Sequence, residues 1–416
     1  MKRNISLVFL FSAPAARGFQ SRQSLLALHH HHFPTHSSVS HSTFNFSASP
    51  ENTASMVDDT NKYRFLKDNE DGGGIRNIVD NYDVFLLDMW GVMHDGVQPY
   101  QGVPEVVQKL KEANKKLIIL SNSSKRRTNC VKMLHKLGFS DDAFDEIITS
   151  GEVAHHLLTY LSDGTTSSWV PESIPDAFQT LRSNTEAGKK LSAFCFGSGD
   201  GDEDYLSSCG WALAESIETA DLIVARGTFV VQSATDIANK NQNEAEYWSA
   251  YQKALETAAA SSNPIPMIVC NPDKVRPDAD KSPMPGTIGA TYQELLKKSH
   301  DDDFESDLVL SLGKPFTGVY EIALASIADN SSSIDKSRVV MVGDALETDV
   351  TGAAAAGIDS VWVLKDGIHD QAITEASSSL EDGCEVVLKG FNERCETTYA
   401  QGRKISPTVA VPHFRW

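Results

Sequence analysis

The sequence predicts an α/β fold, a doubly wound Rossmann-like parallel sheet that is interrupted by an inserted α/β domain. From Tyr82 onward, short apolar runs alternate with amphipathic stretches, which is the pattern of parallel strands joined by crossover helices. The alternation pauses near residue 150 and resumes near residue 307, and the stretch between has strands of its own. We therefore expect a discontinuous core domain, residues 82–150 plus 307–416, and a separate cap domain, residues 151–306.

The individual elements follow from local patterns of apolar residues and from helix-ending glycines. For the first half of the core, the sequence predicts strands over 84–87 and 117–120 and helices over 102–114 and 128–137. For the second half it predicts helices over 316–328 and 347–356 and strands over 339–342 and 360–364. In the inserted segment it predicts strands over 192–196, 222–225 and 266–270 and a long helix over 244–259.

Composition limits the classes of function. The chain has 416 residues, of which 41% are hydrophobic, enough for two or three globular units. Its 37 Lys and Arg against 56 Asp and Glu give a formal net charge of -19, so a broad affinity for nucleic acid, which needs clustered cations, is not expected. The six cysteines include no C-x-x-C pair, so neither a zinc site nor a disulfide framework is indicated.

The first fifty residues contain no Asp or Glu and are interpreted as a targeting segment, so residues 1–55 are expected to lie outside the folded domains. Two basic residues precede the apolar run Ile5 to Phe11, which is too short for stable membrane insertion. A signal-peptide pattern followed by a Ser- and His-rich stretch resembles a bipartite signal plus transit peptide for a complex plastid. A mitochondrial presequence, or a cytoplasmic protein that starts at Met56, are the alternatives.

Polar residues follow three of the predicted strands. Asp88 follows the first strand, Ser121 and Asn122 the second, and Asp344 the strand over 339–342, while Lys314 begins the helix before that strand. Ligands bind at the carboxyl ends of strands in an open parallel sheet, so these side chains are expected to meet. Two carboxylates can hold Mg²⁺ while a lysine and a hydroxyl neutralise phosphate oxygens, which indicates phosphoryl transfer with Asp88 as the nucleophile.

The same residues resemble the four motifs of the haloacid dehalogenase superfamily, in their proper order: Asp88-Met89-Trp90-Gly91-Val92, Ser121-Asn122-Ser123-Ser124, Gly313-Lys314-Pro315 and Gly343-Asp344 through Asp349. The long segment between the second and third motifs, with Cys270-Asn271-Pro272-Asp273 near its end, looks like the cap of class IIA, the group of 4-nitrophenyl phosphate and phosphoglycolate phosphatases. The resemblance covers roughly Tyr82 to Ile368, and it leaves open a homodimer, since cap-mediated dimers occur in class IIA.

The resemblance implies roles for the metal-site residues. Asp88 is implied to be nucleophile and Mg²⁺ ligand, with the backbone carbonyl of Trp90 and the side chain of Asp344 as further ligands. Asp349 is implied to orient metal-bound water. The expected substrate is a small phosphorylated metabolite, hydrolysed through an aspartyl-phosphate.

The resemblance also implies the phosphate and substrate contacts. Ser121 and Lys314 are implied to bind the phosphate, helped by the backbone amide of Asn122. Asn271 and Asp273 lie where class IIA caps approach the active site and are candidates for substrate contact.

Trp90 departs from the family pattern, because phosphatases of this family carry a general acid and base Asp at that position. Indole cannot transfer a proton, and a positioned acid contributes about a hundredfold to ten-thousandfold in rate. His94 and Asp95, just downstream, are candidates to replace it. Slow turnover, a non-catalytic phosphometabolite-binding protein, and chemistry at carbon through the same nucleophile are the interpretations left open.

Overall fold

The structure is a computed structural model that describes residues 63–67, 74–276, 282–300, 307–328, 334–395 and 404–416. The targeting segment expected over residues 1–55 lies outside the described residues. None of the described helices is both long enough and apolar enough to cross a bilayer.

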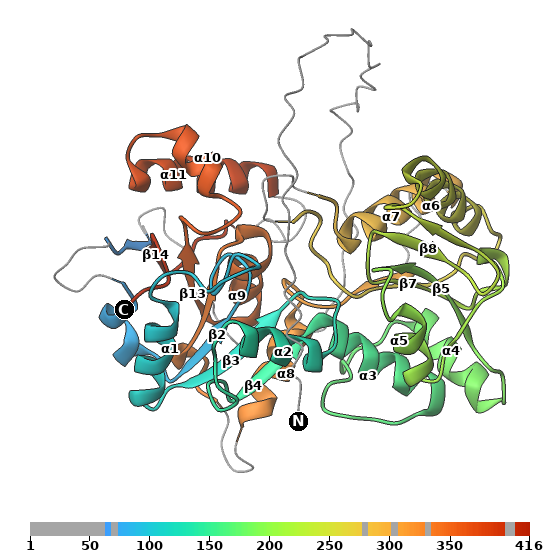
Figure 1. The fold of residues 1–416 in the computed structure, drawn as a ribbon, viewed down its shortest axis with the longest axis horizontal. Coiled ribbons are helices and arrows are strands. Elements are labelled where there is room, and N and C mark those ends of the chain that lie inside the picture. The colour runs from blue at the N-terminus through green and yellow to red at the C-terminus, as the bar shows by residue number, and fades with distance from the viewer. Residues whose placement is uncertain (1–62, 68–73, 277–281, 301–306, 329–333, 396–403) are drawn as a thin grey trace, which may run out of the picture. The chain divides into compact units, whose positions relative to one another are not determined.

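The first sheet is parallel throughout, and its central strand β2 (Val84–Leu87) lies between β3 and β12 (Figure 1). The strand order is β1-β14-β13-β12-β2-β3-β4. The other strands are β1 (Arg64–Phe65), β3 (Lys116–Ser121), β4 (Glu146–Thr149), β12 (Val339–Gly343), β13 (Asp359–Val363) and β14 (Val409–Val411). The core therefore begins before the expected residue 82, because β1 pairs with the last strand of the chain, a long-range pairing that no local pattern announces.

Helices join the strands of this sheet. They are η1 (Gly74–Asn77), η2 (Val79–Asn81), α1 (Val103–Glu112), α2 (Arg127–Lys136), α8 (Thr317–Ile327), η4 (Lys336–Arg338), α9 (Thr351–Ala356), α10 (Asp370–Ala376) and α11 (Leu380–Cys395). The helix expected over 347–356 is wrong in its first turn, where a π-helical turn, η5 (Leu346–Val350), precedes α9. The Thr351 hydroxyl donates to the carbonyl of Leu346 at 2.8 Å, which stabilises this wide turn, and such turns are frequent at functional sites.

The second sheet is mixed, with β8 antiparallel to its neighbours β5 and β9, and has the order β11-β10-β7-β5-β8-β9, with β6 beside β5. Its strands are β5 (Ser192–Gly197), β6 (Ala212–Leu213), β7 (Leu222–Ala225), β8 (Val230–Gln232), β9 (Ile237–Asn239), β10 (Met267–Val269) and β11 (Val309–Ser311). The helices of this part are α3 (Ser150–Asp163), α4 (Asp176–Glu186), α5 (Asp202–Ser208), η3 (Ile217–Thr219), α6 (Glu244–Ala259) and α7 (Pro285–His300). The expected boundary at 306/307 is wrong, because β11 pairs with β10 and so extends the cap to Ser311.

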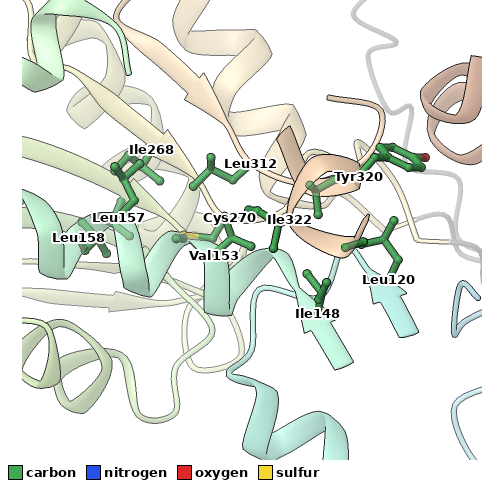
Figure 2. Packing of buried hydrophobic residues seen from close by; sticks show 14 of the residues in the cluster. Leu120, Ile148, Val153, Leu157, Leu158, Ile268, Cys270, Leu312, Tyr320 and Ile322 are labelled. Carbon is green, nitrogen blue, oxygen red and sulfur yellow. The ribbon is translucent and has the colours of Figure 1, made fainter. Parts of the chain in front are cut away.

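One apolar cluster continues from the first sheet into the cap. Alternate residues of β2 and β3 face it, and α3 carries the cluster onward to β10. Figure 2 shows this continuity from Leu120 and Ile148 through Val153 and Leu157 to Ile268. Because a strand exposes successive residues to opposite faces, Phe85 and Leu87 belong to the cluster on the other face. The core and the cap therefore share one buried apolar cluster.

Candidate active site

The candidate site lies at the point where the connections of the first sheet reverse direction. Chain progression leads from β2 to β3 on one side, whereas β12 pairs with β2 on the other. Asp88 directly follows β2, Ser121 ends β3, and Asp344 directly follows β12. The three side chains that the sequence placed at strand ends are therefore carried by adjacent strands, where ligands of doubly wound sheets bind.

Lys314 reaches this edge from the cap side, after the end of β11. Its Nζ lies 2.7 Å from Asp88 Oδ1 and 2.7 Å from Asp349 Oδ1, and its side chain is only 2% exposed. A buried ammonium needs such partners to be tolerated. The contact brings together the first, third and fourth motif residues, as the sequence predicted.

Asp344 and Asp349 are held by backbone donors. Asp344 Oδ2 accepts from the amide of Ile368 at 2.8 Å, and Asp349 Oδ2 accepts from the amide of Ala345 at 3.0 Å. Two glycines leave the room that these carboxylates need. A Cβ at Gly91, where φ is +84°, would lie 2.3 Å from Asp344 Oδ2, and a Cβ at Gly343 would lie 2.1 Å from the Asp349 carboxyl carbon.

The three carboxylates repel one another in a buried place. Burial raises the pKa of Asp88, which Lys314 only partly offsets, and burial raises the pKa of Asp349 to about 6. The pKa of Asp344 is raised further, by burial and by the charges of Asp88 and Asp349. Burial opposes the charge of Lys314, but Asp349 and Asp88 outweigh it and raise the pKa of that lysine. One cation among three carboxyl groups leaves a deficit of positive charge.

A metal ion fits this deficit. One oxygen from each of Asp88, Asp344 and Asp349 can be chosen so that the three lie within 4.8 Å of one another. Carboxylate oxygens are the ligands of hard divalent cations, and a bound ion would relieve the repulsion that raises the three pKa values. These residues would therefore hold a metal ion, although Asp349 also carries the ion pair with Lys314.

We expect the melting temperature of the protein to rise on addition of MgCl₂ at pH 8, and to rise less at pH 5.5. A native-state carboxyl pKa above its ordinary value means that the folded site holds protons more tightly than the unfolded chain does, so protons displace the metal as the pH falls through about 6. Saturation at about one hundred times the dissociation constant stabilises by about 2.7 kcal/mol.

Scanning fluorimetry with EDTA and MgCl₂ measures this shift. Asp344→Asn should abolish it and should raise the metal-free melting temperature at pH 8, since a repelled buried charge is removed. Asp359→Asn, at the start of β13 and away from the site, serves as the matched control and should keep the shift. An equal shift in wild type and in Asp344→Asn would contradict the metal site.

The Asn122 side chain forms hydrogen bonds that hold the backbone of Lys314. Its side chain clamps the Lys314 backbone: Oδ1 accepts from the Lys314 amide at 2.8 Å, and Nδ2 donates to the Lys314 carbonyl at 3.0 Å. Nδ2 also donates to Asp273 Oδ1 at 2.8 Å. Ser121 Oγ accepts from the amide of Ser123 at 3.3 Å, which holds the loop after β3. Of the residues assigned to phosphate, Asn122 thus contacts Lys314 directly, and Ser121 precedes it at the end of β3.

The two cap candidates, Asn271 and Asp273, differ in their contacts with the site. Asn271 is 2% exposed and its Oδ1 accepts from the amide of Asp273 at 2.8 Å, so it shapes the turn after β10. Asp273 is half-buried and contacts Asn122 directly. Its charge also acts on Asp88, whose pKa it raises. Of the two cap candidates, Asp273 is therefore the one whose side chain contacts a residue of the core site.

Trp90 projects an indole where the family pattern has an acid. The ring is half-buried and lies near Gly96, where an added Cβ would be 3.4 Å from it. The guanidinium carbon of Arg276, from the cap loop after β10, lies 5.1 Å from the ring centroid, within cation–π range. Trp90 thus provides a contact between core and cap.

Among the described residues, neither of the two candidates to replace the acid forms a hydrogen bond or ion pair with Asp88 or Lys314. Asp95 is exposed, and its Oδ1 accepts from the amides of Val97 and Gln98 at 2.8 and 2.9 Å, which fixes a turn. His94 is 2% exposed, and its Nδ1 accepts from the amide of Gly96 at 2.8 Å. Burial lowers the pKa of His94, which keeps the imidazole neutral.

The contacts that hold the loop between β3 and α2 were not assigned from the sequence. Glu152, in the first turn of α3, accepts from Arg126 at 2.7 and 2.8 Å and from the amide of Arg127 at 2.8 Å. The hydroxyl of Thr149 donates to the carbonyl of Lys125 at 2.7 Å. The run Thr149-Ser150-Gly151-Glu152 after a strand was a visible signal, since Thr149 also caps α3 by accepting from the amide of Glu152.

The fold and the strand-end site define a capped α/β hydrolase, and comparisons with known proteins agree. A family model for haloacid dehalogenase-like hydrolases matches residues 85–210, and a second haloacid dehalogenase hydrolase-like model matches residues 311–392. Together the two matches span half of the chain. The chain belongs to the haloacid dehalogenase-like hydrolases, in class IIA.

Curated relatives and a solved structure give the same picture. Human chronophin (Homo sapiens) is 26% identical over 297 residues, which cover 70% of this chain and 84% of chronophin. A 4-nitrophenylphosphatase of Schizosaccharomyces pombe is 22% identical and covers 71% of this chain and 88% of its own length. A haloacid dehalogenase-like hydrolase structure from Brucella suis, 20% identical, has a TM-score of 0.53 over 82% of this chain and 98% of its own, a likeness of fold.

Proposed function

We propose that the protein is a Mg²⁺-dependent hydrolase of small phosphate esters that works through an aspartyl-phosphate on Asp88. The observation that carries this proposal is the contact of Lys314 Nζ with both Asp88 and Asp349, beside a third carboxylate. A carboxylate nucleophile, a buried cation and a cluster able to hold a divalent ion are what phosphoryl transfer requires. The 4-nitrophenylphosphatase named among the relatives supports the same chemistry.

The residues of this chain would share the work as follows. Asp88 attacks phosphorus, and Lys314 neutralises charge on the phosphoryl oxygens while the Ser121 hydroxyl donates to one of them. Asn122 keeps Lys314 in place through the clamp on its backbone. Mg²⁺, when bound by the carboxylates of Asp88 and Asp344, supplies Lewis-acid charge neutralisation.

The test is phosphate release from 4-nitrophenyl phosphate by protein that lacks the N-terminal segment, with MgCl₂ and with EDTA. We expect metal-dependent release, which stops with EDTA, because the carboxylates of Asp88 and Asp344 would hold the ion that neutralises phosphoryl charge. Trp90 also motivates a second candidate, a non-catalytic binder of phosphorylated metabolites. Calorimetry distinguishes the two: metal-dependent binding of metabolites without any turnover would favour the binder and reject the hydrolase.

We also propose that residues 1–55 direct the protein to an organelle, a plastid or a mitochondrion. Fusion of these residues to a fluorescent protein should place the fusion in an organelle, whereas a fusion of the chain from Met56 should remain in the cytoplasm. The absence of acidic residues before Glu51 supports the proposal. Cytoplasmic fluorescence from both fusions would contradict it.

A further inference from the structure

The reaction lacks a proton donor if only the family positions are considered. Trp90 has no transferable proton, and Asp95 is exposed and held in a turn. His94 is buried, its Nδ1 accepts from the Gly96 amide and its Nε2 has no partner, so among the described residues no hydrogen bond joins its ring to Asp88 or Lys314. Leaving-group departure and hydrolysis of an aspartyl-phosphate both need a proton carrier near the leaving oxygen. A carboxyl group from the cap is in a position to serve.

We propose that Asp273 is the proton donor and acceptor of this active site, in place of the absent acid at position 90. The inference rests on the proposed function. It gives the cap loop after β10 a catalytic residue, rather than a substrate contact alone.

Asp273 is joined to the nucleophile by a short chain of contacts. Asn122 Nδ2 donates to Asp273 Oδ1 at 2.8 Å, Asn122 Oδ1 accepts from the Lys314 amide at 2.8 Å, and Lys314 Nζ lies 2.7 Å from Asp88 Oδ1. Among the described residues no hydrogen bond to Asp273 Oδ2 is formed, so no protein donor competes for this oxygen. The carboxyl group is thus held through Oδ1, while Oδ2 has no hydrogen-bond partner in the described part of the chain.

The direction of the reaction favours a group from the cap. In an in-line displacement the leaving oxygen departs on the side of phosphorus opposite the attacking carboxylate of Asp88. Asp88 belongs to the strand end of the core, whereas Asp273 belongs to the loop that descends from the cap sheet. A leaving group that departs away from the core therefore departs toward the cap, where Asp273 lies.

The surroundings of Asp273 suit a group that both gives and accepts a proton. Burial raises the pKa of Asp273 to about 6, although the Asn122 hydrogen bond and the charge of Lys314 lower it, and the carboxylates of Asp349 and Glu347 raise it. A carboxyl group poised near neutral pH is an efficient general acid and base. An exposed Asp would be almost fully ionised and a poor donor.

The proton balance is complete in two steps. In the first, an oxygen of Asp88 bonds to phosphorus, the bond from phosphorus to the ester oxygen breaks with its electron pair, and that oxygen takes the proton of the Asp273 carboxyl. In the second, the Asp273 carboxylate takes a proton from water as the water oxygen bonds to phosphorus, and the bond from Asp88 to phosphorus breaks. Inorganic phosphate leaves and Asp273 is again protonated.

The test is Asp273→Asn, which keeps an oxygen that can accept from Asn122 but cannot transfer a proton. With 4-nitrophenyl phosphate, whose leaving group needs no acid, we expect a fast release of close to one 4-nitrophenol per site, then slow turnover as the aspartyl-phosphate accumulates. With glycerol phosphate, whose leaving group needs the acid, we expect turnover to fall about a hundredfold or more, with no fast phase.

Asp95→Asn is the matched control, because Asn also accepts from the turn amides, and it should behave as wild type with both substrates. Equal losses for the two substrates in Asp273→Asn, with no fast phase, would overturn the proposal and indicate a structural role.

If Asp273→Asn melts well below wild type, the double variant Asp273→Asn, Trp90→Asp provides the deciding measurement. Recovery of glycerol phosphate turnover without recovery of the melting temperature would support Asp273 as the proton donor. Recovery of neither quantity would overturn the proposal. Absence of phosphate release by wild type would instead reject the proposed function.

Discussion

Asp88→Asn is expected to reduce phosphate release from 4-nitrophenyl phosphate by about a thousandfold or more. The amide oxygen of Asn is a far weaker nucleophile than a carboxylate, so the covalent step is lost, and losses of this size are typical when a nucleophile is removed. The variant also removes a partner of Lys314, which retains its ion pair with Asp349. Steady-state release at saturating MgCl₂ measures the effect.

Asp83→Asn is the matched control, since Asp83 precedes the same strand β2 at its opposite end and pairs with Arg338 on the surface. Its activity should stay within about twofold of wild type, as is usual for surface substitutions. Full activity in Asp88→Asn would show that the nucleophile assignment is wrong, whatever the metal dependence.

The strand-end site could be predicted because it depends on local patterns. A buried apolar run predicts a strand, and parallel strands bring their carboxyl ends to one edge, so the sequence pattern alone places Asp88, Ser121 and Asp344 together. Lys314 could be added because the motif order fixed its place. In the structure its Nζ contacts the carboxylates of Asp88 and Asp349.

The remaining features depend on long-range geometry. β11 is three residues long, and only its pairing with β10 shows that it belongs to the cap rather than to the core. The Asn122 side chain hydrogen-bonds to the backbone of Lys314, which lies 192 residues further along the sequence. No residue spacing predicts such a contact. In the π-helical turn before α9 the backbone hydrogen bonds reach one residue further along the chain than in an α-helix, and an apolar periodicity is too coarse to detect this difference.

Trp90→Asp is expected to restore alkyl phosphate hydrolysis by about a hundredfold to ten-thousandfold in the Asp273→Asn protein. A carboxylate at position 90 would lie two residues after the nucleophile, where the family carries its acid. In the wild-type background we expect a smaller gain, because Asp273 already carries the proton. The difference between the two backgrounds measures how far the two carboxyl groups replace each other.

Arg276 is expected to affect how well the new carboxylate at position 90 transfers a proton. Its guanidinium carbon lies 5.1 Å from the Trp90 ring, so an Asp at that position would gain a cationic neighbour, which lowers a carboxyl pKa. The acid would then be the weaker donor, and the gain should be larger for aspartyl-phosphate hydrolysis, which needs a base, than for alkyl leaving groups. Trp90→Asn is the control, because Asn is similar in size to Asp but cannot transfer a proton. Equal rates in the Asp and Asn variants would show that removal of the indole, and not proton transfer, causes any gain.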